Sequence, residues 1–425
     1  MGRKKRPPSG PACDALIDTQ ADFPEGETRA ARYAMRTRAG GLLDADAGLS
    51  DGQEVGRVSR CGVKRNSASV EVWVSPEGGA HFRGVETCGS IWRCAVCASK
   101  IAHRRSLEVT ELCDAHMEAG GGLYMATLTL RHRSFDGAVG LRHMVTKAWE
   151  KTQQGNAWVS LKADLGIIGT VRALEVTHGG NGWHPHLHVL FFAGKKLTDA
   201  RLAALTDRLW ARWESAVVRV GGSCSREAFH MREASTGKAG AQYVAKWGAG
   251  QEIAKGAHKD AAGRSVWNLV EASEHDPDAG RLFVEYAKAF KGARHLTYAR
   301  GLREWYGLRD AKEDDELALE GYEDGEIIDK ATGEIITRQT GRIAVFDKGT
   351  WSRIIKKKIM PDILTAAING GTDAVERLLN ANDCHSYYDA REMPAPNWKP
   401  RTPRGRYFDP ANGHATYSDW LAANL

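Results

Sequence analysis

Histidines at alternate positions stand in a strand-like stretch that is otherwise apolar. Side chains two apart on a strand share one face, so His186 and His188 can bind one cation through two neutral imidazoles. His184 has the same parity, although a proline beside it interrupts the pattern. Glu175, on the strand across a glycine-rich turn, could complete a set of two nitrogens and one oxygen. Because the connection at 178–183 is too long to fix the register, the sequence predicts a divalent-metal site whose third ligand stays open.

A tyrosine and a lysine lie three positions apart in a helical pattern over 236–247, and such residues share one helix face. A phenol with a pKa of about 10 is a poor nucleophile at neutral pH, but a nearby cation favours the phenolate. Tyr243 is therefore a candidate nucleophile, and Lys246 could supply that cation or bind a phosphate. The alternative is an ordinary amphipathic helix with a solvated lysine.

Four of the eight cysteines fall within one short segment, which favours a metal site over a disulfide framework. A C-x-x-C pair presents two thiolates to one tetrahedral ion. The predicted structural zinc ligands are Cys88, Cys94, Cys97 and, as the fourth, Cys61. His81 and His103 are alternatives for the fourth position, and buried reduced cysteines without metal are the alternative to the whole site. The other four cysteines have no partner spacing and are predicted to be packing residues.

Strand and helix patterns alternate between residues 122 and 250. Strands are predicted over 122–130, 166–177, 186–192 and 228–232, and helices from about 137 to 155 and over 197–220 and 236–247. This order predicts an α+β fold with a central antiparallel sheet covered by helices.

The remaining segments differ in composition and predict five parts. In chain order these are a disordered basic leader over 1–55, a Cys-rich zinc module with a helix over 56–121, the α+β domain over 122–309, an acidic linker over 310–345, and a small helical C-terminal region and tail over 346–425.

The composition is that of a soluble globular protein, with 42% hydrophobic and 26% charged residues. The net charge of +6 understates the basic character, because residues 311–334 hold ten acidic residues against two lysines. Such asymmetry suits a polyanion partner such as nucleic acid. No stretch approaches the apolar length that spans a bilayer, so we expect a cytoplasmic protein with no membrane partner.

Three short motifs stand in the order found in rolling-circle plasmid replication initiators (Rep proteins) of the HUH endonuclease superfamily, which this chain resembles. They are the strand 126–130, the segment His184-Pro-His186-Leu-His188-Val-Leu, and Tyr243-Val-Ala-Lys246. The resemblance covers roughly residues 122–250, with weaker similarity upstream through the cysteines and downstream to Arg303.

The resemblance implies a ferredoxin-like core and a site-specific single-strand DNA endonuclease that is also a strand transferase. Tyr243 would be the nucleophile, His186 and His188 the metal ligands with Glu175 as the third, and Mg²⁺ or Mn²⁺ the cation. Nicking at the double-strand origin would leave a 5′-phosphotyrosine link and a free 3′-OH, and strands would later be rejoined. The implied partners are plasmid origin DNA, single-stranded or as a hairpin, with a host helicase and DNA polymerase.

The same resemblance places DNA-contacting residues near the site, namely Thr127, Thr129, Arg131 and Lys246. Some relatives carry a glutamate four positions before the tyrosine to activate water, and here that position is Ala239. We do not expect Glu233 to take its place.

Other functions compatible with these residues include a relaxase or transposase of the same superfamily, and a non-enzymatic, zinc-containing DNA-binding regulator. A small-molecule metallohydrolase would use the histidines without any affinity for DNA. No helicase domain is recognisable, and the cysteines precede the three motifs, which favours the replication initiator.

Overall fold

The computed structural model describes residues 25–49, 55–74, 79–234, 265–308, 311–320, 341–384 and 387–388. These residues form an α+β structure with two antiparallel sheets, so the predicted fold class is confirmed at that level. Among the described residues, no helix is both long and apolar enough to cross a bilayer.

The larger sheet has five strands in the order β6-β3-β5-β4-β7, and every neighbouring pair is antiparallel. The strands are β3 (Gly122–Leu128), β4 (Ile167–Gly179), β5 (Gly182–Ala193), β6 (His230–Glu233) and β7 (Leu296–Tyr298). β4 and β5 form a long hairpin that pairs without interruption from Gly169 and Phe192 to Gly179 and Gly182. The segment expected as a six-residue loop is thus largely strand, closed by a two-residue turn. Gly182 takes a φ of +83°, a conformation that favours glycine.

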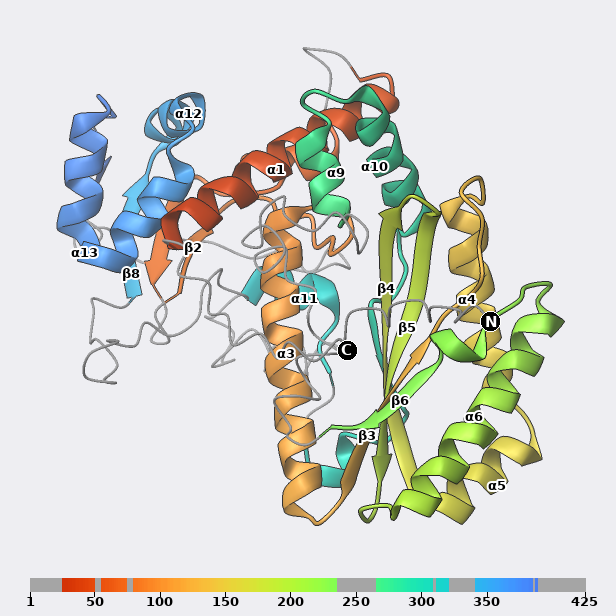
Figure 1. The fold of residues 1–425 in the computed structure, drawn as a ribbon. Helices are drawn as coiled ribbons and strands as arrows, with labels where there is room; N and C mark the ends of the chain where they lie inside the picture. The colour runs from red at the N-terminus through yellow and green to blue at the C-terminus, as the bar shows by residue number, and fades with distance from the viewer. Residues whose placement is uncertain are drawn as a thin grey trace, which may run out of the picture.

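Helices cover both faces of this sheet (Figure 1). One face packs against α4 (Ala138–Thr152), α5 (Asn156–Leu165) and α6 (Asp199–Arg219), and buries Leu187, Val189 and Phe191 of β5. The other face packs against α3 (Ala95–Glu118), and buries the alternate residues Leu190 and Phe192. This two-sided burial is why β5 is largely apolar at both parities.

The smaller sheet joins residues from both ends of the chain, in the order β2-β1-β8-β9. Its strands are β1 (Val70–Val74), β2 (Ala80–Arg83), β8 (Gly341–Phe346) and β9 (Tyr387–Tyr388). The helices of this part are α2 (Arg57–Arg60), α12 (Lys348–Lys357) and α13 (Met360–Ala381), and α13 has non-helical backbone at Gly370 and Gly371. The helices expected in the C-terminal region therefore form, but as part of one unit with the cysteine segment.

The N-terminal leader is a correction to the sequence-based interpretation, because residues 25–46 of the predicted disordered stretch form the helix α1 (Glu25–Asp46). It contacts α13, α3, α9 (Val266–Ala272) and α10 (Pro277–Ala289), and so connects the two sheets' helices (Figure 1). Arginines occupy inward positions of α1, and Arg29 and Arg36 donate hydrogen bonds to Thr365 and to the Cys61 carbonyl. Interior arginines hide the apolar stripe that would have marked a helix.

The acidic linker is the second correction. Residues 314–320 form the helix α11 (Asp314–Glu320), which packs on α3, where Arg105 lies 2.7 Å from the Asp314 carboxylate. Residues 341–346 form β8, the strand that pairs with β1. Opposite charge on α3 accounts for the position of α11, and non-local strand pairing accounts for β8.

The fold of the smaller sheet predicts a strong dependence on Trp351, which is fully buried between Phe82 and Phe346 and donates a hydrogen bond to the Val63 carbonyl at 2.8 Å. Trp351→Ala is expected to lower the free energy of unfolding by about 3–5 kcal/mol, as for other buried tryptophans. Urea denaturation measures the change, with Trp305→Ala as the control, since Trp305 is 72% exposed. Equal stability of the two variants would contradict this packing.

Candidate active site and structural metal site

Strand pairing brings the predicted metal ligands together on one face of the larger sheet. Glu175 of β4 lies directly opposite His186 of β5, and His188 is two residues further along the same face. One oxygen of Glu175 lies 2.6 Å from Nε2 of His186 and within hydrogen-bond distance of Nε2 of His188. The candidate ligand atoms all lie within 4.8 Å of one another. The register that the sequence left open is therefore one that lets Glu175 join both histidines.

The environment favours an ionised carboxylate in contact with imidazoles. Burial alone would raise the pKa of Glu175, but hydrogen bonds and attraction from His186 and His188 outweigh it and hold that pKa well below its usual range. Burial opposes protonation of His186, yet the Glu175 carboxylate raises its pKa. Each of the three side chains is 12–15% exposed, so the cluster remains open to a ligand from solvent.

This donor set fits a divalent cation. Two imidazole nitrogens and one carboxylate oxygen suit ions such as Mn²⁺, and three protein ligands leave coordination positions for a substrate. The alternative, that His186 and His188 are ordinary core residues, agrees less well with the structure. Their ring nitrogens point at a carboxylate rather than into apolar packing.

Neighbouring residues hold the imidazoles in place. Thr127 of β3 lies opposite His188, and its hydroxyl is 3.2 Å from Nδ1 of that ring. Nδ1 of His186 donates to the backbone carbonyl of His184 at 3.1 Å. Such contacts to the second ring nitrogen fix the orientation of a ligating histidine. Thr127 was predicted near the site as a DNA contact, and its observed contact is with a candidate ligand.

A further histidine, which sequence reasoning missed, contacts His184, the neighbour of the cluster on β5. Nε2 of His132 lies 2.8 Å from Nδ1 of His184, and Nδ1 of His132 lies 2.9 Å from the Asn181 carbonyl. Burial, together with His186 and His132, lowers the pKa of His184 to about 4, so its ring is neutral at physiological pH. The signal available in the sequence was only that His132 stands between two arginines just after a strand.

The other predicted site residues are placed less directly. Thr129 follows β3, and its carbonyl accepts a hydrogen bond from Trp213. Arg131 is exposed in the loop beyond, where its backbone N–H donates to the Ser223 carbonyl. Tyr243 and Lys246, like Ala239, lie outside the described residues, so their predicted roles stay predictions.

Glu233 lies away from the cluster of Glu175, His186 and His188. It pairs with Tyr124 on β3, whose side chain belongs to the opposite face of the sheet from Thr127. Its carboxylate lies 2.8 Å from the Lys196 ammonium.

The four predicted cysteines converge in a second, fully buried cluster. Sulfur–sulfur distances are 3.5 Å from Cys61 to Cys97, 3.6 Å from Cys88 to Cys97 and 3.8 Å from Cys94 to Cys61. A tetrahedral zinc ion with four Zn–S bonds of about 2.3 Å places its sulfurs about 3.8 Å apart. The cluster could therefore hold zinc, and the fourth candidate ligand that joins it is Cys61 rather than His81 or His103.

The surroundings of Cys61 suit a thiolate ligand. Hydrogen bonds from the thiols of Cys88, Cys94 and Cys97 lower the pKa of Cys61 well below its usual value, against the effect of burial. The backbone N–H of Cys88 also donates to the Cys61 sulfur at 3.4 Å. Among the cysteines without partner spacing, Cys113 and Cys384 are buried packing residues, as predicted.

Comparison with known proteins gives two matches to curated sequences. The chain is 27% identical over 314 residues to "Protein rep" of Streptomyces lividans, a match that covers 57% of this chain and 69% of that protein. It is 32% identical over 149 residues to "Neomycin resistance protein" of Streptomyces cyanogenus, covering 29% of this chain and 34% of that protein. No family model matches the chain. No solved structure matches it either. The similarity to Protein rep thus extends over more than half of the chain.

The cysteine cluster predicts one zinc ion per chain. Cys97→Ser should lose that ion, because a hydroxyl does not replace a buried thiolate in a tetrahedral sulfur site. Elemental analysis of protein dialysed against a weak chelator measures the zinc content. Cys224→Ser, at a partly buried cysteine outside the cluster, is the control and should keep the metal. Full zinc content in the Cys97 variant would contradict the assignment.

The histidine cluster predicts a second, weaker site that binds Mn²⁺. His186→Ala should weaken Mn²⁺ binding more than about tenfold, and Thr127→Val should weaken it by a smaller factor because it removes only an orienting contact. Calorimetric titration of zinc-replete protein measures both effects. The exposed His275 supplies the control, since His275→Ala should leave the affinity unchanged. Equal affinities in all four proteins would rule out this metal site.

Proposed function

We propose that the protein is a plasmid replication initiator of the Rep type that nicks one strand at the double-strand origin for rolling-circle replication. The observation that carries the proposal is the open cluster of Glu175, His186 and His188 on a sheet, in a chain similar to a protein named Protein rep. The order of the three sequence motifs and the basic character of the chain outside its acidic segment support the same function.

The proposed reaction is a transesterification that needs no co-reactant. The Tyr243 phenolate oxygen forms a bond to the phosphorus of the scissile phosphodiester, and the bond from phosphorus to the 3′ oxygen breaks. The proton lost by the phenol is balanced by the proton taken up at the 3′ oxygen. The products are a 5′-phosphotyrosine and a free 3′-OH, and attack by a 3′-OH in the reverse sense rejoins a strand. Lys246 is proposed to favour the phenolate or to bind the phosphate.

In this proposed reaction, the role of the described residues is to orient the candidate metal ligands. Glu175 contacts both imidazoles, and Thr127 holds the ring of His188 from the far side. A bound Mg²⁺ or Mn²⁺ would act as a Lewis acid on the scissile phosphate. The start of β6, His230, pairs with Thr127, so this strand begins beside the cluster.

Origin DNA, single-stranded or in hairpin form, is the proposed substrate, and a host helicase and DNA polymerase would act on the nicked product. Exposed Arg131 lies on the loop that follows β3 and is a proposed phosphate contact. The zinc module is proposed to help position DNA ahead of the catalytic sheet, and a cytoplasmic location follows from this role.

A zinc-containing DNA-binding regulator without enzymatic activity is the second candidate, because the buried cysteine cluster alone fits it. A relaxase or transposase would share the nicking chemistry and differ in its DNA target. An experiment distinguishes the regulator from the nicking enzymes, because a regulator forms no covalent adduct with DNA.

The proposal predicts a covalent protein–DNA adduct on Tyr243. Protein incubated with Mn²⁺ and single-stranded oligonucleotides that tile the encoding replicon should gain the mass of a 5′-terminal DNA fragment, and peptide mass spectrometry should find it on Tyr243. Tyr243→Phe should abolish the adduct and retain DNA binding, because only the nucleophilic oxygen is lost.

Two further variants test whether adduct formation depends on the metal-ligand cluster and on Tyr243 in particular. Glu175→Gln keeps the shape of the side chain but removes its charge, and should reduce adduct formation by at least about a hundredfold if the cluster holds the required cation. Tyr306→Phe, at a tyrosine that contacts His116 on the other end of the sheet, should still form the adduct. DNA binding without an adduct in the unmodified protein would favour the regulator instead.

A further inference from the structure

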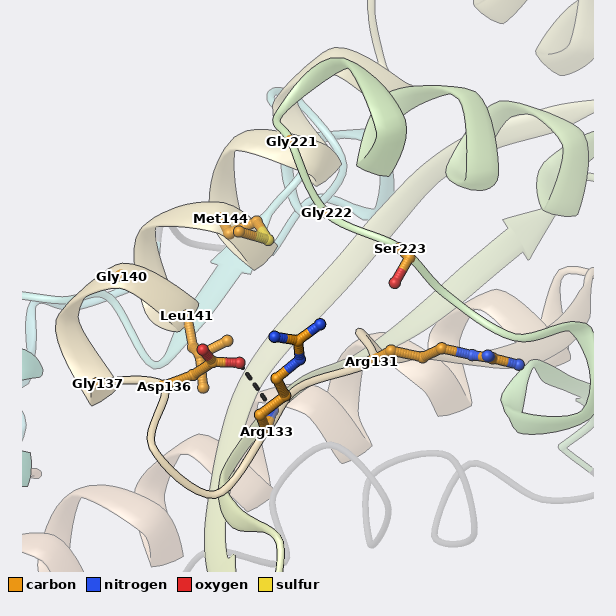
Figure 2. A pocket seen from close by; sticks show the side chains of 10 residues that line it. All are labelled: Arg131, Arg133, Asp136, Gly137, Gly140, Leu141, Met144, Gly221, Gly222 and Ser223. Atoms are coloured by element: carbon orange, nitrogen blue, oxygen red, sulfur yellow. Dashed lines mark hydrogen bonds between the residues drawn. The ribbon is translucent and has the colours of Figure 1, made fainter.

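A pocket of about 460 Å³ lies where the loop after β3 leads into α4, outside the cluster of Glu175, His186 and His188. Its walls come from three segments: the loop after β3, the first turns of α4, and the loop that follows α6 (Figure 2). The lining residues are Arg131, Arg133, Asp136, Gly137, Gly140, Leu141, Met144, Gly221, Gly222 and Ser223.

Glycines, which have no side chain, form much of the pocket wall. Four of its lining residues are glycines, and a Cβ atom built at Gly140 meets nothing within 4 Å. At Gly222, by contrast, a Cβ would lie 2.6 Å from the Met144 sulfur. Leu141 and Met144 add an apolar surface opposite the polar rim. A volume of about 460 Å³ is large enough for a nucleobase.

The rim of the pocket is basic and carries an exposed aromatic ring. Figure 2 shows the Arg133 side chain reaching between Met144 and Ser223, while Arg131 extends away from them. In the described part of the chain, neither guanidinium forms an ion pair. The neighbouring Phe135 is 76% exposed, and the Arg133 guanidinium lies 5.7 Å from its ring centre. Exposed aromatic rings among arginines are the side chains on which single-stranded bases stack.

Asp136 adds a polar group that could read a base. One of its oxygens accepts a hydrogen bond at 2.7 Å from the backbone N–H of Arg133, which fixes the carboxylate at the pocket wall. The second oxygen makes no hydrogen bond with the described residues. A carboxylate oxygen in this position can accept from the amino group of a base.

The loop that forms the rim is attached to the hairpin that carries the metal ligands. Between Arg131 and Arg133, His132 contacts the ring of His184 and the carbonyl of Asn181. Gly182 of the turn packs so closely on Ser134 that a Cβ there would lie 2.9 Å from its backbone. The arginine-bearing loop is thus held against the turn end of that hairpin.

We infer that this pocket binds one nucleotide of single-stranded DNA, outside the nucleotides at the reaction centre. Arg133 contacts its phosphate, the base packs on Met144 and Leu141, and the free oxygen of Asp136 accepts from the base. This inference rests on the proposed function for its substrate class, since DNA is the ligand in both. It adds a specificity-determining subsite to the proposed nicking reaction.

The test measures DNA affinity in a Tyr243→Phe background, where no cleavage takes place. A fluorescent single strand, the tightest binder of a set that tiles the replicon, is compared with versions that lack one base at a time. One position should lose about tenfold in affinity when its base is missing. Gly140→Leu places a side chain in the pocket and keeps a residue that favours helix. This variant should bind the intact strand about tenfold more weakly. Removing the responsive base should then weaken its binding no further, because the variant and the missing base remove the same contact.

Arg133→Ala should weaken binding about tenfold and reduce the slope of log affinity against log salt by about 0.7, the value for one phosphate contact on a single strand. Arg208→Ala is the matched control, because it removes the same charge from α6, where Arg208 pairs with Asp164 of α5 at 3.0 Å. Unchanged thermal unfolding verifies that each variant folds.

The outcomes separate the pocket from the nicking reaction. If the unmodified protein forms the Tyr243 adduct but no base position responds to Gly140→Leu, the pocket assignment is wrong and nicking stands. If that response is present and no adduct forms, the pocket stands and nicking fails. If Arg133→Ala and Arg208→Ala weaken DNA binding equally, Arg133 contributes only general electrostatic attraction. The assignment of a nucleotide subsite would then be wrong.

Discussion

The register of the β4–β5 hairpin is the constraint on which the candidate site depends. Glu175 lies opposite His186 because the two strands close through a two-residue turn, and every pair between that turn and the far end follows. A slip of one residue would turn the histidines onto the face packed by α4, α5 and α6, and would expose Leu187 and Val189 instead. The free energy of burying that apolar face therefore also holds the three candidate ligands in place.

The helix α3 connects the two candidate metal sites. Cys94 caps the start of α3 and Cys97 lies in its first turn, so the cysteine cluster fixes where that helix begins. Further along α3, Val109 and Leu112 pack on the sheet face that carries the histidines, with Leu190 of β5. Zinc at the cysteines would thus stabilise the helix that covers one end of this face, and the other end remains open around Glu175.

Local patterns in the sequence predicted the ligand groups, and non-local packing determined the rest. Alternation predicted β5 and its histidines, and the short C-x-x-C spacing predicted the cysteine cluster, because both depend on neighbours in the chain. The pairing of β8 with β1 joins residues that are far apart in sequence, and no local pattern indicates it. The helix α1 was hidden because Arg29 and Arg36 take positions that apolar residues usually fill. His132 could not be assigned, since its contact with His184 depends on how a loop returns to the hairpin.

Charge and burial together distinguish the basic loop after β3 from basic residues that belong to the fold. Arg105 is buried and paired with Asp314 and Glu108, and Arg36 is buried against a backbone carbonyl, so their charges serve the fold. Arg131 and Arg133 are exposed on a loop whose position is fixed by its contacts to the hairpin. An exposed guanidinium on a fixed loop loses less conformational freedom when it binds a phosphate than one on a loose segment, so more of the interaction appears as affinity. The residues that orient the candidate ligands would then also set the path of the strand that reaches them.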